Sequence, residues 1–238
     1  LASLRFSKRA AIIALLAALL CAERILPNVV YRPDSQATKN AGIVVISFNA
    51  WRHQMHPDEA ARALVLSGAD IILLQEAHAL LNTKADTLKS EYPYQSSCPN
   101  LCDLAIISKL PISNFRYRVT DGRGSYIGPR IVLAELKVRR GEEPITFGTI
   151  HLYRRSRKSG HGLTVAQQLQ AMFAVLPKAN LILGGDFNMT PWSFTLEKID
   201  KTMLPVRRVS NSTPTYPAKV AGVSTVPLFP IDHLFADT

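Results

Sequence analysis

The order of strand-like and helix-like segments predicts an α+β fold in which layers of helix and sheet stack as a sandwich. Three observations favour it. Strand-like and helical patterns alternate in the first half of the chain, several strands then follow one another directly, and no Gly-rich phosphate loop of a doubly wound nucleotide-binding fold occurs. With 238 residues, of which 47% are hydrophobic and 19% charged, the chain can bury one substantial core.

The N-terminal residues have the pattern of a signal peptide or a membrane anchor. Lys8 and Arg9 precede an apolar stretch at 10–22 that shows no polar face at helical spacing, which argues against an ordinary buried helix. This stretch has the length of the apolar region of an export signal and is short for a transmembrane span. We therefore predict a signal peptide or anchor over 1–26, a polar linker over 27–41 and a folded domain over 42–238.

The folded domain is expected to begin with alternating strands and helices and to continue with consecutive strands. The apolar runs predict strands at 42–51, 69–77, 103–112, 117–120, 130–140, 144–153, 181–188 and 231–238. Helical spacing of apolar residues predicts helices at 57–67, 78–90 and 164–177. The segment 189–230 is rich in turn residues, and we expect loops there.

The cysteines bear on the compartment of the protein. Cys98 and Cys102 lie four residues apart around Pro99 and Asn100, a turn that can close a small disulfide loop outside the cytoplasm. Metal binding by the same pair is the alternative, although no second Cys or His pair follows at zinc spacing. We predict the disulfide. The expected location is the periplasmic or extracellular side, with the protein secreted or anchored to the inner membrane.

The charge of the chain favours an anionic partner. The net charge is +10, and the densest basic run lies at 153–161, with Arg154, Arg155, Arg157 and Lys158. Basic runs are usually solvated loops, so this run alone is weak evidence for phosphate binding. Candidate substrate-binding residues are Arg154 and Arg155, together with Arg130.

Several predicted strands end in an acid, an amide or a histidine. In chain order these residues are Asn49, Glu76, His151, Asp186 with Asn188, and Asp232. Strand ends on a rigid core can converge into one pocket. Singly, most have a structural alternative: Asp186 can cap the following turn, Asn49 can form an Asx turn, and a lone His151 is more often structural than catalytic. Glu76 is harder to explain away, because a carboxylate directly after an apolar run must be paired, ligated or exposed.

The combination of oxygen ligands with an imidazole points to phosphate chemistry. Carboxylate and amide oxygens suit Mg²⁺ or Mn²⁺, which keep bound waters and bridge to phosphate oxygens. An imidazole beside such an ion suits stabilisation of a phosphoryl group or proton transfer to it.

The motifs that contain these residues resemble the endonuclease/exonuclease/phosphatase superfamily. They are, in order, "SFNAW", "LLQEAH", "GTIHL", "GGDFNMTP" and "PIDHLF", and they extend from about residue 42 to the C-terminus. The "GDFNMTPWS" segment after an apolar stretch is most similar to exported or membrane-anchored bacterial members. The resemblance implies a DNase I-like four-layer α/β/β/α sandwich and a divalent-metal-dependent phosphoesterase.

The resemblance also implies roles for individual residues. Glu76 matches the glutamate that binds the metal, and Asn49 matches the asparagine that supports the same site. His151 matches the histidine that contacts the scissile phosphate. Asp186 and Asn188 match the pair that positions the attacking water and the phosphate.

The C-terminal end departs from the family pattern. Members normally finish with a Ser-Asp-His motif whose histidine serves as acid and base, whereas this chain ends at Thr238. Asp232 and His233 are either that pair or part of the preceding strand, whose aspartate orients the final histidine. The second interpretation matches better, and it implies a C-terminally truncated domain that lacks its last strand.

The function expected from the sequence is phosphodiester hydrolysis by an activated water, of the nuclease type. The alternatives are a sphingomyelinase-like or phosphatase-like enzyme acting on a lipid or small phosphoester, and a catalytically silent module that binds polyanions. The expected partners are a nucleic acid or lipid head group, and the membrane if the N-terminal segment is uncleaved. We expect a monomer with Mg²⁺ or Mn²⁺ as cofactor.

Overall fold

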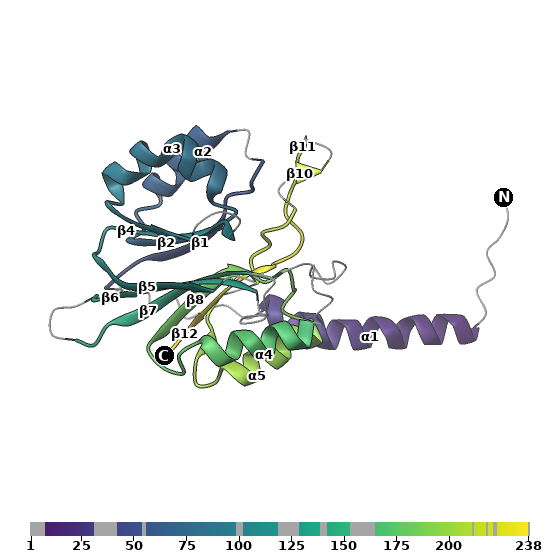
Figure 1. Cartoon of the computed structure of the whole chain (residues 1–238). Coiled ribbons are helices and arrows are strands. Elements are labelled where there is room, and N and C mark those ends of the chain that lie inside the picture. Colours follow the sequence, from purple (N-terminus) through teal and green to yellow (C-terminus); the bar gives the residue numbers. More distant parts are fainter. Residues whose placement is uncertain are drawn as a thin grey trace.

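Helices and sheets stack in four layers in the computed structural model of the chain (Figure 1). The outer layers are helices α2 (Pro57–Leu66) and α3 (His78–Glu91) on one side, and α4 (Val165–Val175) and α5 (Phe194–Met203) on the other. Two sheets lie between them. Helix α1 (Lys8–Val30) extends away from the sandwich. The α+β sandwich predicted from the sequence is confirmed. The residues described by the structure are 8–30, 42–53, 56–98, 102–118, 129–138, 142–152, 165–210, 212–217, 219–220 and 223–237.

The first sheet has the order β1-β2-β4-β3 and lies under α2 and α3. Strands β1 and β2 are parallel, with α2 as the crossover between them, whereas β4 is antiparallel to both β2 and β3. Every residue of β2 and β4 is buried, as expected for strands that are covered on both faces. The strands of this sheet are β1 (Val45–Asn49), β2 (Ile71–Gln75), β3 (Tyr94–Ser97) and β4 (Leu104–Ser108).

The second sheet has the order β5-β6-β7-β8-β12-β9. Its strands are antiparallel except for β7 and β8, which are parallel and are connected through α4. A separate hairpin is formed by β10 (Lys219–Val220) and β11 (Val223–Ser224). The strands of the second sheet are β5 (Ile112–Arg118), β6 (Arg130–Leu136), β7 (Ile145–His151), β8 (Leu181–Asp186), β9 (Arg207–Arg208) and β12 (Asp232–Ala236).

The two sheets approach each other closely at Gly184 of β8. A Cβ atom at this position would lie 2.8 Å from Leu73 Cδ1 of β2 and 3.1 Å from Ser47 Cβ of β1. Because glycine has no side chain, β8 can lie directly against the first sheet. The apolar run of β8 therefore ends beside the ends of β1 and β2.

Helix α5 corrects the expectation that 189–230 consists of loops. It begins after Ser193, whose side-chain oxygen accepts a hydrogen bond from the Leu196 backbone N–H at 3.1 Å, an N-cap that satisfies one unpaired donor of the first turn. Leu196, Ile199 and Met203 recur at helical spacing and are buried against the second sheet. The N-cap and this spacing were visible in the sequence, but the surrounding Pro, Ser and Thr residues masked them.

Other boundaries also differ from the predictions. The segment predicted as one strand at 103–112 contains the whole of β4, a turn in which Leu110 N–H donates to Ser108 Oγ, and the start of β5. Strand β3 was not predicted. Helix α1 runs to Val30, past the predicted boundary at residue 26, and the rest of the predicted linker lies outside the described residues.

We predict that Gly185→Ala destabilises the protein severely. A Cβ atom would lie 2.0 Å from the backbone oxygen of Ile150, and the residue has a φ of +157° that side-chain-bearing residues rarely adopt. Strain and overpacking together should lower the free energy of unfolding by about 3 kcal/mol or more, measured by urea unfolding. The control is Gly68→Ala, where φ is +69° but no atom lies within 4 Å, so the loss should be about 1 kcal/mol. Equal losses would contradict the proposed close approach.

Candidate active site

Five strands deliver polar residues to one end of the sandwich. The parallel pair β1 and β2 places Asn49 opposite Gln75, so that Glu76 follows at the same edge. The parallel pair β7 and β8 places His151 opposite Asp186, and β12 begins with Asp232 opposite Asp186. The convergence follows directly from strand direction, because the carboxyl ends of parallel neighbours meet at one edge.

Asp186 is the hub of this cluster. Its Oδ2 accepts a hydrogen bond from Asn49 Nδ2 at 3.1 Å and lies 3.8 Å from His151 Nε2. Its Oδ1 accepts from the backbone N–H of Asn188 at 2.8 Å. The side chain of Asn188 donates in turn to Leu152 O at 2.7 Å, which ties the loop after β8 to the end of β7. The structure therefore brings together Asn49, His151, Asp186 and Asn188, four of the residues that the motifs predicted as one site.

Glu76 occupies a strained position beside this hub. Its φ is +50°, a left-handed conformation that is unusual for a residue with a long side chain. Its Oε2 accepts from the backbone N–H of Arg52 at 2.8 Å, and the carboxylate is 17% exposed. Trp51, Asp103 and Asn188, which belong to the surrounding loops, also have positive φ values. Backbone strain of this kind collects at functional sites, where the rest of the fold holds it in place.

Gln75 and Thr149 link the two sheets beneath the site, and sequence reasoning gave neither a role. The buried Gln75 Nε2 donates to Thr149 Oγ1 at 2.8 Å and to Leu73 O at 2.9 Å, while Thr149 Oγ1 donates to Leu74 O at 3.2 Å. Because these polar groups are buried, losing any of these hydrogen bonds would lower the stability of the fold. A buried glutamine directly before Glu76 was the available signal in the sequence.

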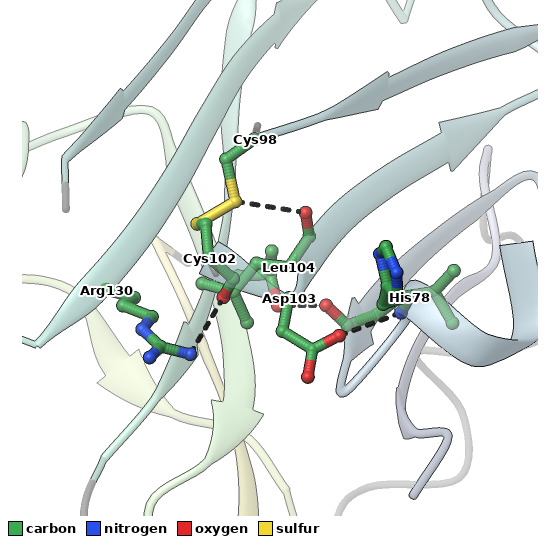
Figure 2. The surroundings of a disulfide bond; sticks show 8 residues. His78, Cys98, Cys102, Asp103, Leu104 and Arg130 are labelled. Carbon is green, nitrogen blue, oxygen red and sulfur yellow. Dashed lines mark hydrogen bonds between the residues drawn. A yellow bond between two sulfur atoms is a disulfide. The ribbon is translucent and has the colours of Figure 1, made fainter. Parts of the chain in front are cut away.

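Cys98 and Cys102 form a disulfide that supports a loop next to the site (Figure 2). Asp103 follows it and accepts hydrogen bonds from the backbone N–H of His78 at 2.8 Å and from Arg52 Nη2 at 3.1 Å. Cys102 O accepts from Arg130 Nη1 at 3.4 Å. The loop thus contacts Arg52, which hydrogen-bonds Glu76, and Arg130, which lies opposite His151 in the pairing of β6 with β7.

Asp232 is a buried carboxyl group with an unusual environment. Burial, and secondly the nearby charge of Asp186, raise the pKa of Asp232 to about 6, although a hydrogen bond from Thr215 opposes the shift. No described residue hydrogen-bonds its Oδ1, which is buried. Burial also lowers the pKa of His151, against the opposing effect of Glu76, which favours the neutral form of this imidazole.

His233 lies on the opposite face of β12 from Asp232, because successive side chains of a strand point to opposite faces. It is 1% exposed, and its Nε2–H donates to Met189 O at 2.8 Å. Its Nδ1 lies 3.4 Å from Ser210 Oγ, and its ring packs against Phe187. The structure therefore does not bring His233 to the other predicted site residues.

The basic residues predicted to bind substrate are only partly described. Arg130 lies beside the site, where its guanidinium contacts the disulfide loop. The run with Arg154, Arg155, Arg157 and Lys158 falls outside the described residues.

The donor set fits a hard divalent ion. Among the described residues, no group of three or more His, Cys, Asp or Glu side chains could hold a metal alone. Mg²⁺ does not need such a cage, because it keeps several waters and binds one or two carboxylates plus substrate phosphates. Arg52 Nε lies 3.7 Å from Glu76 Oε2, so the carboxylate of Glu76 already has a positively charged neighbour. Asn49 Oδ1 accepts one hydrogen bond, from Trp51 N–H, and has a second lone pair.

The sequence pattern of the endonuclease/exonuclease/phosphatase family matches residues 46–238. The chain belongs to this family. Its members are phosphoesterase hydrolases, and the family is metal-dependent, which agrees with a site built from carboxylates, an amide and an imidazole. No match is found among curated protein sequences.

Several solved structures share the fold of this chain. A β-hairpin deletion mutant of beta toxin from Staphylococcus aureus is 19% identical, with a TM-score of 0.58 over 82% of this chain and 87% of that one. Sphingomyelinase C from Streptomyces griseocarneus is 16% identical, with a TM-score of 0.55 over 80% and 81%. TDP2 from C. elegans is 19% identical, with a TM-score of 0.55 over 81% and 64%. A beta toxin mutant with bound magnesium ions is also similar, at 18% identity and a TM-score of 0.59 over 82% and 83%.

We predict that His233 gives the protein acid sensitivity without taking part in catalysis. Burial lowers the pKa of His233 to about 4, so the neutral form is favoured in the folded state. The stability from this group is complete above pH 6.5 and is lost as the pH falls towards 4, by on the order of 3 kcal/mol. His233→Gln should flatten unfolding free energy against pH in this window. If the variant loses activity but keeps the pH dependence, a catalytic role for His233 is supported instead.

We also predict that the disulfide supports metal binding. Replacing Cys98 and Cys102 together by Ser frees the loop that holds Asp103, so Arg52 no longer orients Glu76 as tightly. Groups that orient a ligand typically change metal affinity by about 10-fold to 100-fold, and titration calorimetry with Mn²⁺ should show weakening of this order. The control is Cys21→Ser, because this thiol is exposed on α1 and unpaired. Equal Mn²⁺ affinity in both variants would remove the disulfide from this role.

Proposed function

We propose that the protein hydrolyses phosphodiester bonds with a divalent metal ion, by attack of an activated water. The observation that carries this proposal is the cluster around Asp186, in which the amide of Asn49 and the imidazole of His151 surround one buried carboxylate. In a family of phosphoesterases, this arrangement would supply three groups side by side. They are a metal ligand in Asn49, an acid that orients water in Asp186, and a hydrogen-bond donor to the phosphate in His151.

Each residue then has a distinct task. Glu76, with Asn49 beside it, would hold Mg²⁺ or Mn²⁺, and the ion would offset the negative charge of the phosphoryl oxygens. Asp186 orients the attacking water and accepts its proton, and Asn188 fixes the orientation of Asp186. The neutral His151 donates a hydrogen bond to a phosphoryl oxygen. As the water oxygen bonds to phosphorus, the bond to the leaving oxygen breaks, and that oxygen takes a proton from solvent.

Asp232 has a supporting task in this proposal. Its buried Oδ1 and its raised pKa suit a carboxyl group that shares a proton with a neighbouring acid or base. Its position opposite Asp186 keeps it within the same cluster. His233 is not assigned to catalysis, because its hydrogen bonds hold it in the core.

The preferred substrate is a polyanionic phosphodiester such as nucleic acid. The net charge of +10 supports this choice, and Arg130 lies next to His151, with Arg154 and Arg155 following it in the sequence. A lipid head group is the second candidate. It is favoured by a specific observation, the apolar helix α1 with its 18-residue segment from Ala10 to Pro27 that is long and apolar enough to cross a membrane. We place the domain on the periplasmic or extracellular side, as a monomer.

We predict that Glu76→Gln and Asp186→Asn each lower kcat by about 10²-fold to 10⁴-fold, because one removes a metal ligand and the other a proton acceptor. The assay compares single-stranded DNA, sphingomyelin vesicles and a phosphomonoester, each with Mg²⁺, Mn²⁺ or a chelator. Glu59→Gln is the control, since this glutamate lies on α2 and its side chain is 81% exposed. Activity and melting temperature should separate: both variants should stay folded.

The outcomes of this assay discriminate the candidates. Metal-dependent cleavage of DNA supports the nuclease, and cleavage of sphingomyelin alone supports the lipid enzyme. Binding of the substrates without turnover by the wild-type protein would leave the silent module and overturn the proposed hydrolysis. Equal losses of melting temperature and activity in the variants would assign the two carboxylates to structure.

A further inference from the structure

Helix α1 has an apolar surface that no part of the described domain covers. The segment from Ala10 to Pro27 has a mean hydropathy of 2.0, and none of its residues is fully buried. The exposed side chains surround the helix, as shown by Ile12, Ile13, Leu15, Leu16, Leu19 and Leu20, which are 55 to 68% exposed. A helix that is apolar on all sides is stable only in an apolar environment.

The C-terminal end of α1 is different, because it is docked on the domain through Arg24. The guanidinium donates through Nε to Trp192 O at 2.6 Å and through Nη2 to Glu197 Oε2 at 2.8 Å. Its Cζ also lies over the ring of Phe194, 3.8 Å from the ring centre. One side chain thus makes a hydrogen bond, an ion pair and a cation–π contact with the beginning of α5. Ala22 and Ile25 beside it are partly buried.

The docked segment lies close to the reaction centre in the chain. Trp192 and Phe194 follow Asp186 and Asn188 within the same stretch, "GDFNMTPWSF". Phe194 is 77% exposed and Trp192 is partly exposed, so two aromatic rings stand at the surface beside the end of the apolar helix. Trp and other aromatic side chains favour the interface between hydrocarbon and water.

We propose that α1 is retained as a membrane anchor and that Arg24 docks the catalytic domain against the lipid surface through Trp192, Phe194 and Glu197. A cleaved signal peptide has no use for three specific contacts with the mature domain, whereas a permanent anchor gains a fixed orientation from them. The partner is a phospholipid bilayer. The proposal concerns placement and does not depend on which phosphoester is hydrolysed.

The dimensions and charges of α1 agree with this placement. The 18-residue apolar segment from Ala10 to Pro27 is about 27 Å long at 1.5 Å per residue, close to the apolar core of a bilayer, which is about 30 Å thick. Arg24 lies near the end of this segment, where its long side chain can extend towards the head groups. Arg5, Lys8 and Arg9 precede the apolar segment that begins at Ala10, which favours a cytoplasmic N-terminus and a domain outside. The Cys98–Cys102 disulfide suits the same side of the membrane.

Tryptophan quenching by brominated lipids tests the proposal in the full chain. The protein has two tryptophans, so Trp51→Phe leaves Trp192 as the reporter. In phosphatidylcholine vesicles with brominated acyl chains, we expect at least a 2-fold loss of Trp192 fluorescence. Arg24→Ala and Glu197→Gln, which break the docking from either side, should each reduce this loss. Arg62→Ala is the matched control on the exposed face of α2, at the opposite side of the sandwich, and should quench like the parent.

Retention of α1 is tested by the intact mass of the protein from carbonate-washed membranes. A mass that includes Arg24, together with quenching that depends on Arg24 and Glu197, supports the proposal. A mature chain that begins after residue 24 overturns it. So does quenching that is equal in the parent and the docking variants, because the domain would then swing freely on its anchor. A soluble dimer with an unquenched Trp192 would assign the apolar surface to a second copy and overturn it as well.

Discussion

The hydrogen bond from Asn49 to Asp186 joins the two sheets at the place where the chemistry is expected to occur. β8 approaches β1 across Gly184, where a Cβ atom would crowd Leu73 Cδ1 at 2.8 Å and Ser47 Cβ at 3.1 Å. The cross-sheet bond from Gln75 to Thr149 fixes the same approach from within the core. The geometry of the site is therefore a property of sheet packing, and loops such as the one that carries Asn188 refine it.

Strand direction explains why much of the site could be predicted from the sequence. An apolar run that ends in an acid or an amide is visible without a structure, and parallel neighbours bring such ends together, as they do for His151 and Asp186. Asp103 and Arg52 could not be found in this way, because they lie in short polar loops. Arg52 contacts Glu76, and Asp103 contacts Arg52, only through the tertiary fold. The three residues are far apart in the sequence, so no helical or strand-like spacing indicates that they meet.

Sequence alone also could not show which of two neighbouring residues in one strand belongs to the site. Asp232 and His233 are adjacent, and the sequence alone left both as candidates. The alternation of β12 separates them: one faces the cluster around Asp186, and the other donates to Met189 O inside the core. Helix α5 was missed for a different reason, since Ser193 begins it within a stretch of turn residues. Local composition favoured loops there, and burial of Leu196 and Ile199 against the second sheet decided for a helix.

The left-handed backbone of Glu76 lowers the stability of the protein but keeps a carboxylate in the candidate site. Glycine and asparagine adopt a φ of +50° more readily than glutamate does, so either would relieve strain at position 76. Selection for heat resistance alone would consequently favour variants that discard the carboxylate. Consensus design or laboratory evolution that selects only for survival at high temperature would favour a more stable protein whose site lacks this carboxylate. The trade-off between stability and function is therefore set by the backbone angle of one residue.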